Sequence, residues 1–345
     1  MFESKFRFSV GPWNVHTGAD SYGPATRQEV DLEEKCKKFA ELGFSAVQFH
    51  DDDAVPNMNN MTEEEIKEYA AGVKKMLDRY GLKAEFVAPR LWMDEHCVDG
   101  GFMSARKEDR DFAMWRAYRS IDIARALGTD LIVLWLAREG TVCAESKSAV
   151  DATKYLIEAL NGMLAYDSTI RIAIEPKPNE PIDRSICGTM GHVMAVASAT
   201  IDPKRVGGNE ESAHAVLAGL DPTNEMGFAL AMGKLFTVHL NDQNGIKFDQ
   251  DKSFGVENLR SAFNQVKLLV ENHYGEHGEY IGLDVKAMRT TSDEDRYEHL
   301  KNSLAIFKAL EEKVSHYDYA YTDKLIAERK FEQLEMYVMN LIMGV

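Results

Sequence analysis

The sequence lacks long apolar runs, a signal-like N-terminus and closely spaced cysteines. Its apolar runs all fall short of the roughly 20 residues that a membrane-spanning helix needs, so we expect no membrane partner. The first residues, M-F-E-S-K-F-R-F, have no apolar core of the kind that signal peptides carry. The four cysteines are widely separated, which is typical of free thiols in a reducing compartment. Together these absences predict a cytoplasmic protein.

Positive charge is also scarce. The chain carries 40 Lys and Arg residues against 56 Asp and Glu residues, which gives a formal net charge of -16. A chain this acidic repels phosphate backbones, so we expect no nucleic-acid partner. The excess of acidic residues can also reflect carboxylates gathered around bound cations, although surface charge that aids solubility is the commoner reason.

Short apolar runs alternate with helical patterns from one end of the 345 residues to the other. Eight of these runs are expected to be strands, although the run V-G-G-N-E-E has little strand propensity. Eight strands separated by helices predict an α/β protein with a (β/α)8 TIM barrel. No glycine-rich phosphate loop follows the first run, which argues against a doubly wound sheet. The expected strands are 6–10, 45–49, 83–88, 130–134, the run that ends at Glu175, 206–211, 235–240 and 279–283.

The domain organisation follows from the same pattern. We expect residues 1–312 to form a catalytic barrel and residues 313–345 to form a short C-terminal helical tail that takes part in subunit contacts. Helices are expected near 31–43, 62–81, 108–127, 149–164 and 293–312, with the helical tail over 322–341.

Each expected strand ends in a residue suited to chemistry. The carboxyl ends of barrel strands gather at one mouth, where barrel enzymes build their active sites. Three carboxylates, two imidazoles and three indoles at one mouth indicate a metal site with apolar walls. These strand-end residues are Trp13, His50, Trp92, Trp135, Glu175, Glu211, His239 and Asp284.

Two further patterns add candidate metal ligands. Glu211 and His214 are three residues apart, and Asp249 and Asp251 are two apart. Oxygen-rich sites with one or two imidazoles suit magnesium, manganese or cobalt. Lys177, two residues after Glu175, can hydrogen-bond a substrate oxygen that becomes negative during reaction. Each pattern alone is commoner on solvated helix faces and in loops, and tryptophans at strand ends more often serve packing.

Several stretches resemble the xylose isomerase family, and the resemblance covers most of the chain up to about Arg289. They are F-H-D-D-D at 49–53, D-G-G-F at 99–102, R-E-G at 138–140, I-E-P-K-P-N-E-P at 174–181 and L-N-D-Q-N-G-I-K-F-D-Q-D at 240–251. The resemblance implies a metal-dependent aldose–ketose isomerase that forms a homo-oligomer, a dimer or a tetramer. Tyr22 lies where the family has an aromatic residue lent to a neighbouring subunit.

The resemblance also implies two divalent metal ions per subunit. Glu175, Glu211 and Asp284 match ligands of the first metal, with Glu211 bridging. The positions of His214, Asp249 and Asp251 match ligands of the second.

The family pattern further implies roles around the sugar. His50, supported by Asp53, matches the residue that assists opening of the sugar ring. Lys177 matches the residue that holds O1, and Trp13 and Trp135 match the substrate walls.

Three positions depart from the family. His239 replaces an aspartate ligand of the first metal, and nitrogen ligation favours manganese, cobalt or zinc over magnesium. Trp92 replaces a phenylalanine of the substrate wall, and Arg90 replaces a small polar residue. These changes indicate either an altered substrate (a different pentose, a hexose or an acidic sugar) or drift compensated by neighbours.

The leading hypothesis is interconversion of D-xylose and D-xylulose, or of D-glucose and D-fructose, by a 1,2-hydride shift. The alternative is a metal-dependent epimerase or lyase that acts on a related or modified sugar with the same barrel. Lys177 and the His50–Asp53 pair favour the isomerase. A barrel that lost catalysis and serves as a scaffold is disfavoured because so many ligand positions remain.

Overall fold

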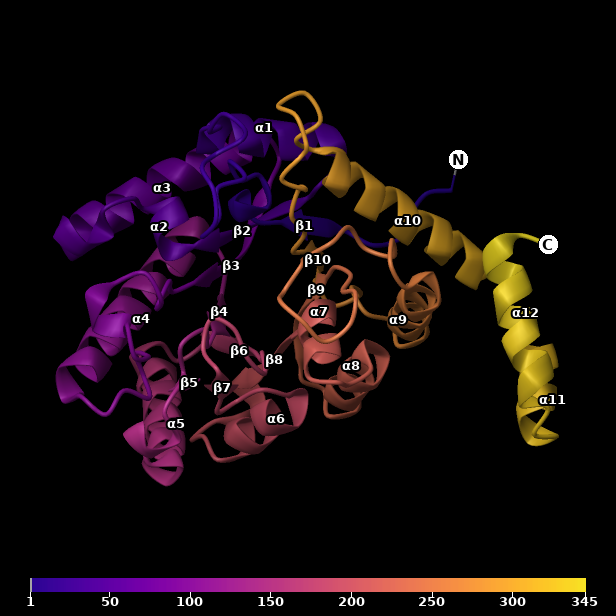
Figure 1. Ribbon diagram of the computed structural model, residues 1–345. Coiled ribbons are helices and arrows are strands. Elements are labelled where there is room, and N and C mark those ends of the chain that lie inside the picture. The colour runs from indigo at the N-terminus through magenta and orange to yellow at the C-terminus, as the bar shows by residue number, and fades with distance from the viewer. Residues whose placement is uncertain (1) are drawn as a thin grey trace.

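The computed structural model describes residues 2–345, and these contain a closed barrel of eight parallel strands (Figure 1). Around the barrel the strands follow the order β1-β10-β9-β8-β6-β4-β3-β2. The predicted (β/α)8 TIM barrel is therefore confirmed. The barrel strands are β1 (Phe8–Val10), β2 (Ala46–His50), β3 (Lys83–Ala88), β4 (Leu131–Trp135), β6 (Arg171–Glu175), β8 (Val206–Glu211), β9 (Leu235–Leu240) and β10 (Ile281–Leu283).

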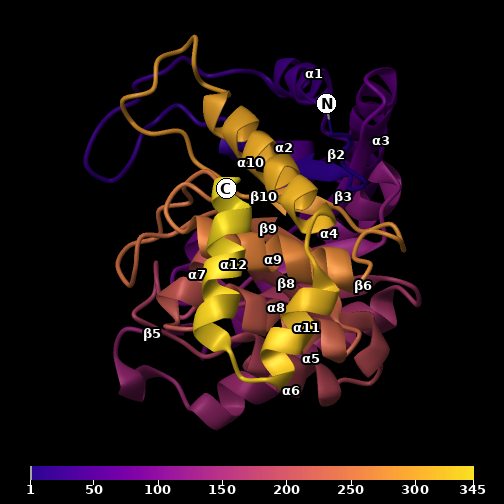
Figure 2. The same cartoon turned by 90° about the vertical axis from the view of Figure 1, so that its right-hand side faces the viewer.

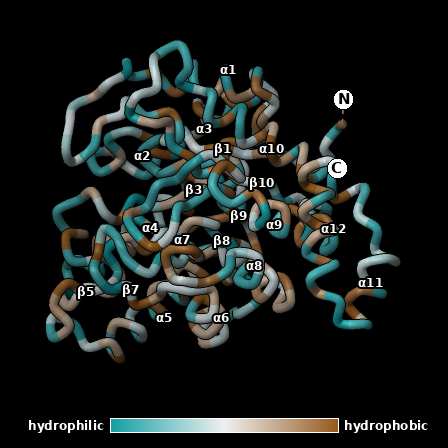
Figure 3. The backbone as a smooth tube through the Cα atoms, turned by 45° about the vertical axis from the view of Figure 1, so that its right-hand side comes forward, coloured by the Kyte–Doolittle hydropathy of each residue, from teal (hydrophilic) through white to brown (hydrophobic). Residues whose placement is uncertain are grey.

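Helices surround the barrel, and in Figure 3 hydrophobic and hydrophilic segments alternate along them, as expected when one face of each helix packs inward. The long helices are α1 (Leu32–Leu42), α3 (Glu63–Arg79), α4 (Lys107–Leu127), α5 (Ala149–Tyr166), α6 (Met190–Ser198), α8 (Pro222–Ala231), α9 (Leu259–Glu271), α10 (Glu298–Ser315), α11 (Tyr319–Ala327) and α12 (Phe331–Met343). The short elements are η1 (Pro12–Asn14), α2 (Asp51–Ala54), η2 (Met58–Asn60), η3 (Glu95–Cys97), β5 (Gly140–Thr141), η4 (Ala144–Ser146), β7 (Arg184–Ser185), η5 (Pro203–Arg205) and α7 (Ser212–Leu217).

Local sequence accounts for several helix ends. The side chain of Asp31 accepts a hydrogen bond from the backbone N–H of Glu34 and caps α1, which ends at Gly43 in the left-handed conformation. Thr62 and Glu65 form a reciprocal capping box at the start of α3. These capping and stop signals lie at the ends where the sequence predicts them.

The weak strand over 206–211 is a fully buried strand, β8. A Cβ atom on Gly207 would lie 2.5 Å from the carbonyl oxygen of Lys234, and one on Gly208 would lie 2.5 Å from the side chain of Met190. Glycine is therefore required for close packing here, and tertiary packing overrides the low strand propensity.

Two helix boundaries differ from expectation. Helix α10 begins at Glu298, about five residues late. The carbonyl of Asp293, at the expected start, accepts from the side chain of Arg296, and its carboxylate accepts from the backbone N–H of Gln28. The helical tail is divided into α11 and α12 by Arg329, whose φ of 56° is left-handed. In Figure 2 the two tail helices lie side by side, and α12 contacts both α9 and α10.

A buried ion pair anchors the end of β2 to the surrounding helices. The carboxylate of Asp51 is fully buried and accepts two hydrogen bonds of 2.7 Å from the guanidinium of Arg116 on α4. The hydroxyl of Ser120 donates a third, at 3.1 Å. Because Asp51 directly follows His50, this pair fixes where β2 delivers its terminal side chain.

We predict that Arg116→Met will destabilise the fold by about 3–5 kcal/mol, because it leaves the Asp51 carboxylate buried without its cation. Chemical denaturation monitored by circular dichroism measures the loss. Lys107→Met is the control, since its ion pair with Asp111 is exposed and its removal should change stability little. Equal stabilities for the two variants would contradict the anchoring role.

Candidate active site

The candidate residues from all eight strand ends converge on one cavity of about 210 Å³ at the carboxyl end of the barrel. Asp53 does not line this cavity itself, but its carboxylate contacts His50, which does. Sequence positions spread over more than 270 residues are therefore brought together. The candidates that line the cavity are Trp13, His50, Arg90, Trp92, Trp135, Glu175, Lys177, Glu211, His214, His239, Asp249, Asp251 and Asp284.

The ends of β6, β8, β9 and β10 supply a compact group of carboxylates around one imidazole. The Nδ1 atom of His239 lies 3.2 Å from a carboxylate oxygen of Glu175, 3.5 Å from one of Glu211 and 3.9 Å from one of Asp284. Ligand atoms of Glu211, His239 and Asp284 all lie within 4.8 Å of one another, which is close enough to share one cation.

Glu211 also belongs to two neighbouring groups with the same spacing. One consists of Glu175, Glu211 and His214, and the other of Glu211, Asp249 and Asp251. Its carboxylate, 1% exposed, is thus common to every such group that residues 2–345 form. A carboxylate shared between groups is the arrangement expected of a bridging ligand between two cations.

Two asparagines that sequence reasoning did not select orient these carboxylates. The amide nitrogen of Asn209 donates to Glu175 at 2.7 Å, and that of Asn241 donates to Glu211 at 2.8 Å and to Asp251 at 3.1 Å. Both are visible in the sequence beside strand-end candidates, in N-E-E and L-N-D. Nothing local marks which carboxylate each of them contacts.

Two further contacts restrain the carboxylates of Asp284 and Asp251. The indole N–H of Trp13 donates to Asp284 at 2.9 Å, so this wall residue also holds a candidate ligand. Lys286 forms an ion pair with Asp251. Hydrogen bonds of this kind fix ligand orientation in metal sites.

The electrostatics of the cluster reflect crowded carboxylates in a buried space. Burial alone would lower the pKa of His239, but Glu175, Glu211 and Asp284 raise it well above its usual value. Burial raises the pKa of Glu211 well above normal, and the neighbouring carboxylates add to this effect. Burial likewise raises the pKa of Asp251 to about 8, although Lys286 opposes the shift. Bound protons and Lys286 therefore offset the negative charge of these carboxylates. A divalent cation bound among them could offset the same charge.

The cluster also fits a divalent metal by its unused donor atoms. Within residues 2–345, one carboxylate oxygen of Glu211, one of Asp249 and Nδ1 of His214 are buried without a hydrogen-bond partner. Buried polar atoms of native proteins are rarely left unpaired. Carboxylate oxygens combined with imidazole nitrogens are the donors that divalent transition metals accept.

His50 stands on the opposite side of the cavity. Its Nδ1 atom lies 2.9 Å from a carboxylate oxygen of Asp53, which also accepts from the backbone N–H of His50. The Arg90 guanidinium pairs with Asp52 at 2.7 Å and Asp53 at 3.0 Å and approaches the same Nδ1 at 2.8 Å. The positive charge of Arg90 is thus offset by two carboxylates.

Lys177 lies between the carboxylates and the aromatic wall. Its Nζ atom lies 2.7 Å from Asp249 and 5.2 Å from the ring centroid of Trp135. Burial lowers the pKa of Lys177, but Asp249 more than compensates and the net shift is upward, so the ammonium stays charged. Trp92 packs edge-on against Trp135, with ring centroids 4.6 Å apart.

Three expectations concern regions outside the cavity. Tyr22 is 99% exposed, at the tip of the loop after β1. Cys36, Cys97, Cys143 and Cys187 are free thiols. Across residues 2–345, every helix is too short or too polar to cross a membrane.

Comparison with known proteins agrees with this geometry. The sequence model of the family described as xylose isomerase-like TIM barrel matches residues 36–267. A xylose isomerase of Thermus thermophilus is 35% identical over 320 residues, which cover 91% of this chain and 81% of that protein.

Solved structures show the same fold at lower identity. A D-tagatose 3-epimerase-like protein superposes with a TM-score of 0.65 at 18% identity, over 89% of this chain and 99% of that one. A 3-keto-D-glucoside 4-epimerase of E. coli gives a TM-score of 0.62 at 16% identity, over 88% and 99%. The family match and the Thermus relative together establish that this chain belongs to the xylose isomerase-like TIM barrel family.

Proposed function

We propose that this protein is a divalent-metal aldose–ketose isomerase that acts on a neutral sugar, with D-xylose and D-xylulose as the first candidates and D-glucose and D-fructose next. One observation carries the proposal. A charged lysine, a carboxylate-supported histidine and a shared carboxylate cluster line one cavity of about 210 Å³. The Thermus relative, named a xylose isomerase, supports the choice of sugar.

Two groups of residues would hold the metals. Glu175, Glu211, His239 and Asp284 would bind the first ion, and Glu211, His214, Asp249 and Asp251 would bind the second. Bound divalent ions supply Lewis-acid polarisation of a sugar hydroxyl and carbonyl.

The protein side chains would do the remaining work. His50, oriented by Asp53, exchanges a proton with the ring oxygen as the sugar opens. The ammonium of Lys177 stabilises negative charge on O1. Hydrogen then moves as hydride between C1 and C2 while a proton passes from O2 to O1, so the product is an isomer of the substrate. The indoles of Trp13, Trp92 and Trp135 keep water away from the transferring hydrogen.

The cations that line the cavity are all paired with carboxylates, which favours a neutral sugar over an acidic one. Arg90 is the cation whose presence suggests an acidic substrate, but Asp52 and Asp53 both pair with it. Lys177 and Lys286 are likewise paired, with Asp249 and Asp251. A carboxylated sugar would have to displace one of these ion pairs.

We expect the metal-loaded protein to interconvert an aldose and its ketose when it is incubated with a panel of pentoses and hexoses. Lys177→Met should lower kcat by about 10²–10³-fold, because it removes the cation that opposes charge on O1. Product formation is followed by chromatography or by carbon NMR.

The matched control is Lys252→Met, which removes a lysine outside the cavity. Metal content of Lys177→Met should equal that of the wild type. If no sugar of the panel is converted with magnesium, manganese or cobalt, the isomerase proposal fails and an epimerase or lyase on this barrel replaces it.

His239 leads us to expect a preference for manganese, cobalt or zinc, since an imidazole nitrogen is a better ligand for these ions than for magnesium. Elemental analysis of the purified protein, with activity measured after chelation and reloading, tests the preference. Protein that contains only magnesium and is fully active with it would rule the preference out.

We propose that the tail over 313–345 contributes to contacts between subunits of a dimer or tetramer. Ile326 of α11 and Phe331 and Met336 of α12 are each at least half exposed, and apolar groups exposed together can mark a surface that another subunit covers. Phe331→Glu combined with Met336→Glu should therefore lower the molecular mass measured by light scattering. An unchanged mass, or a monomeric wild type, would contradict this role.

A further inference from the structure

A layer of polar side chains crosses the inside of the barrel beneath the proposed metal ligands Glu175, Glu211, His239 and Asp284, which we call the metal-binding cluster. Ser9 of β1, Gln48 of β2, Glu85 of β3 and Thr237 of β9 all point inward and are at most 7% exposed. The amide nitrogen of Gln48 lies 3.1 Å from the Ser9 hydroxyl and 3.1 Å from Glu85, while Thr237 donates to Glu85 at 2.7 Å. Barrel interiors are usually filled by branched apolar residues, so a hydrogen-bonded layer here requires a reason.

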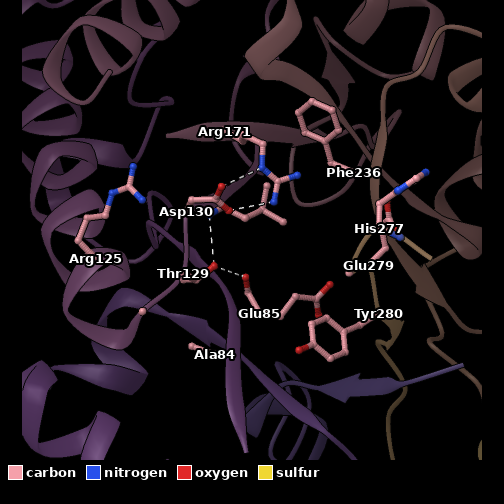
Figure 4. A pocket seen from close by; sticks show the side chains of 13 residues that line it. Ala84, Glu85, Arg125, Thr129, Asp130, Arg171, Phe236, His277, Glu279 and Tyr280 are labelled. Atoms are coloured by element: carbon pink, nitrogen blue, oxygen red, sulfur yellow. Dashed lines mark hydrogen bonds and ion pairs between the residues drawn. The ribbon is translucent and has the colours of Figure 1, made fainter. Parts of the chain in front are cut away.

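The layer is bounded below by a second cavity of about 420 Å³ at the amino end of the strands (Figure 4). Glu85 lines this cavity, and Arg171 and Asp130 at its rim are paired with each other. Above the layer, residues further along the same strands lead to the metal-binding cluster, where β9 carries His239 two positions after Thr237. Glu85 and Gln48 therefore lie between the second cavity and the cluster.

The two ring nitrogens of His239 have different surroundings. Its Nδ1 atom faces the carboxylates of the cluster, whereas its Nε2 atom is buried and has no hydrogen-bond partner within residues 2–345. The amide oxygen of Gln48 is also buried and unpartnered in this described part of the chain. One atom can donate and the other can only accept, so the two are complementary.

The backbone between them leaves room for this approach. A Cβ atom on Gly282 of β10 would lie 2.4 Å from the Gln48 amide nitrogen and 3.2 Å from Cδ2 of His239, the ring carbon bonded to Nε2. The side chains of Gln48 and His239 thus both border the space that Gly282 leaves open. A larger residue at this position would separate them.

We propose that Gln48 is a positioning residue for His239: its amide oxygen accepts the Nε2 proton through one bridging water and links the imidazole to Glu85. The proposal rests on His239 being a metal ligand, as proposed above. A histidine that ligates through Nδ1 must carry its proton on Nε2, and an acceptor for that proton fixes both the tautomer and the ring orientation. An aspartate at this position, as in the family pattern, offers no such proton, so the role of Gln48 is specific to His239.

The test is a double-mutant cycle of metal affinity with Gln48→Leu and His239→Asp. Calorimetric titration of the chelator-stripped protein with Mn²⁺, without sugar, should show that Gln48→Leu weakens binding about 10–100-fold when His239 is present. The same substitution should have little effect in the His239→Asp background. Equal losses in both backgrounds would overturn the proposal.

A spectroscopic measurement covers the case in which Gln48→Leu does not fold. Nitrogen-15 NMR of the zinc-loaded wild type, with the His239 signals identified by their absence in His239→Asp, should show the proton on Nε2. A proton on Nδ1 would overturn the proposal without any Gln48 variant. Because neither experiment uses sugar, failure of the isomerase activity would leave these readouts unchanged and is separable from failure of this inference.

Discussion

The buried carboxylate of Glu211 is the group on which the mouth of the barrel depends. Glu211 is the last residue of β8, it belongs to all three candidate metal groups found in residues 2–345, and other carboxylates surround it. Burial of so much negative charge is unfavourable unless opposite charge or hydrogen bonds accompany it. Opposite charge comes from the imidazoles of His214 and His239 and from the lysines of the cavity, and hydrogen bonds come from Asn209 and Asn241. A divalent cation would compensate the charge more fully.

Charge compensation also explains the opposite wall. Asp51, Asp52 and Asp53 follow β2 directly, and Arg116 and Arg90 pair with them. Arg90 therefore holds the His50 end of the cavity together and adds no unpaired positive charge. This favours a change in local architecture over a change to an acidic substrate.

Much of the fold is predictable because its determinants are local. Apolar runs mark seven of the eight strands, and capping residues such as Asp31 and Thr62 mark helix starts. The exceptions depend on distant contacts. Residues 206–211 form a strand because neighbouring groups pack against Gly207 and Gly208, and α10 starts late where Gln28, far back in the sequence, engages the side chain of Asp293. Propensity cannot report such contacts.

The sequence by itself determined which side chains follow each strand and therefore which chemistry could meet at the mouth. Only the tertiary structure decided which of them touch: Trp13 with Asp284, Asn209 with Glu175, and Gln48 with Ser9 and Glu85. The physical reason is that strand periodicity is a property of neighbouring residues, whereas these pairs form only when the barrel closes. Trp13 and Asp284 are 271 residues apart in the chain, and the β1–β10 pairing that joins them is the closure itself.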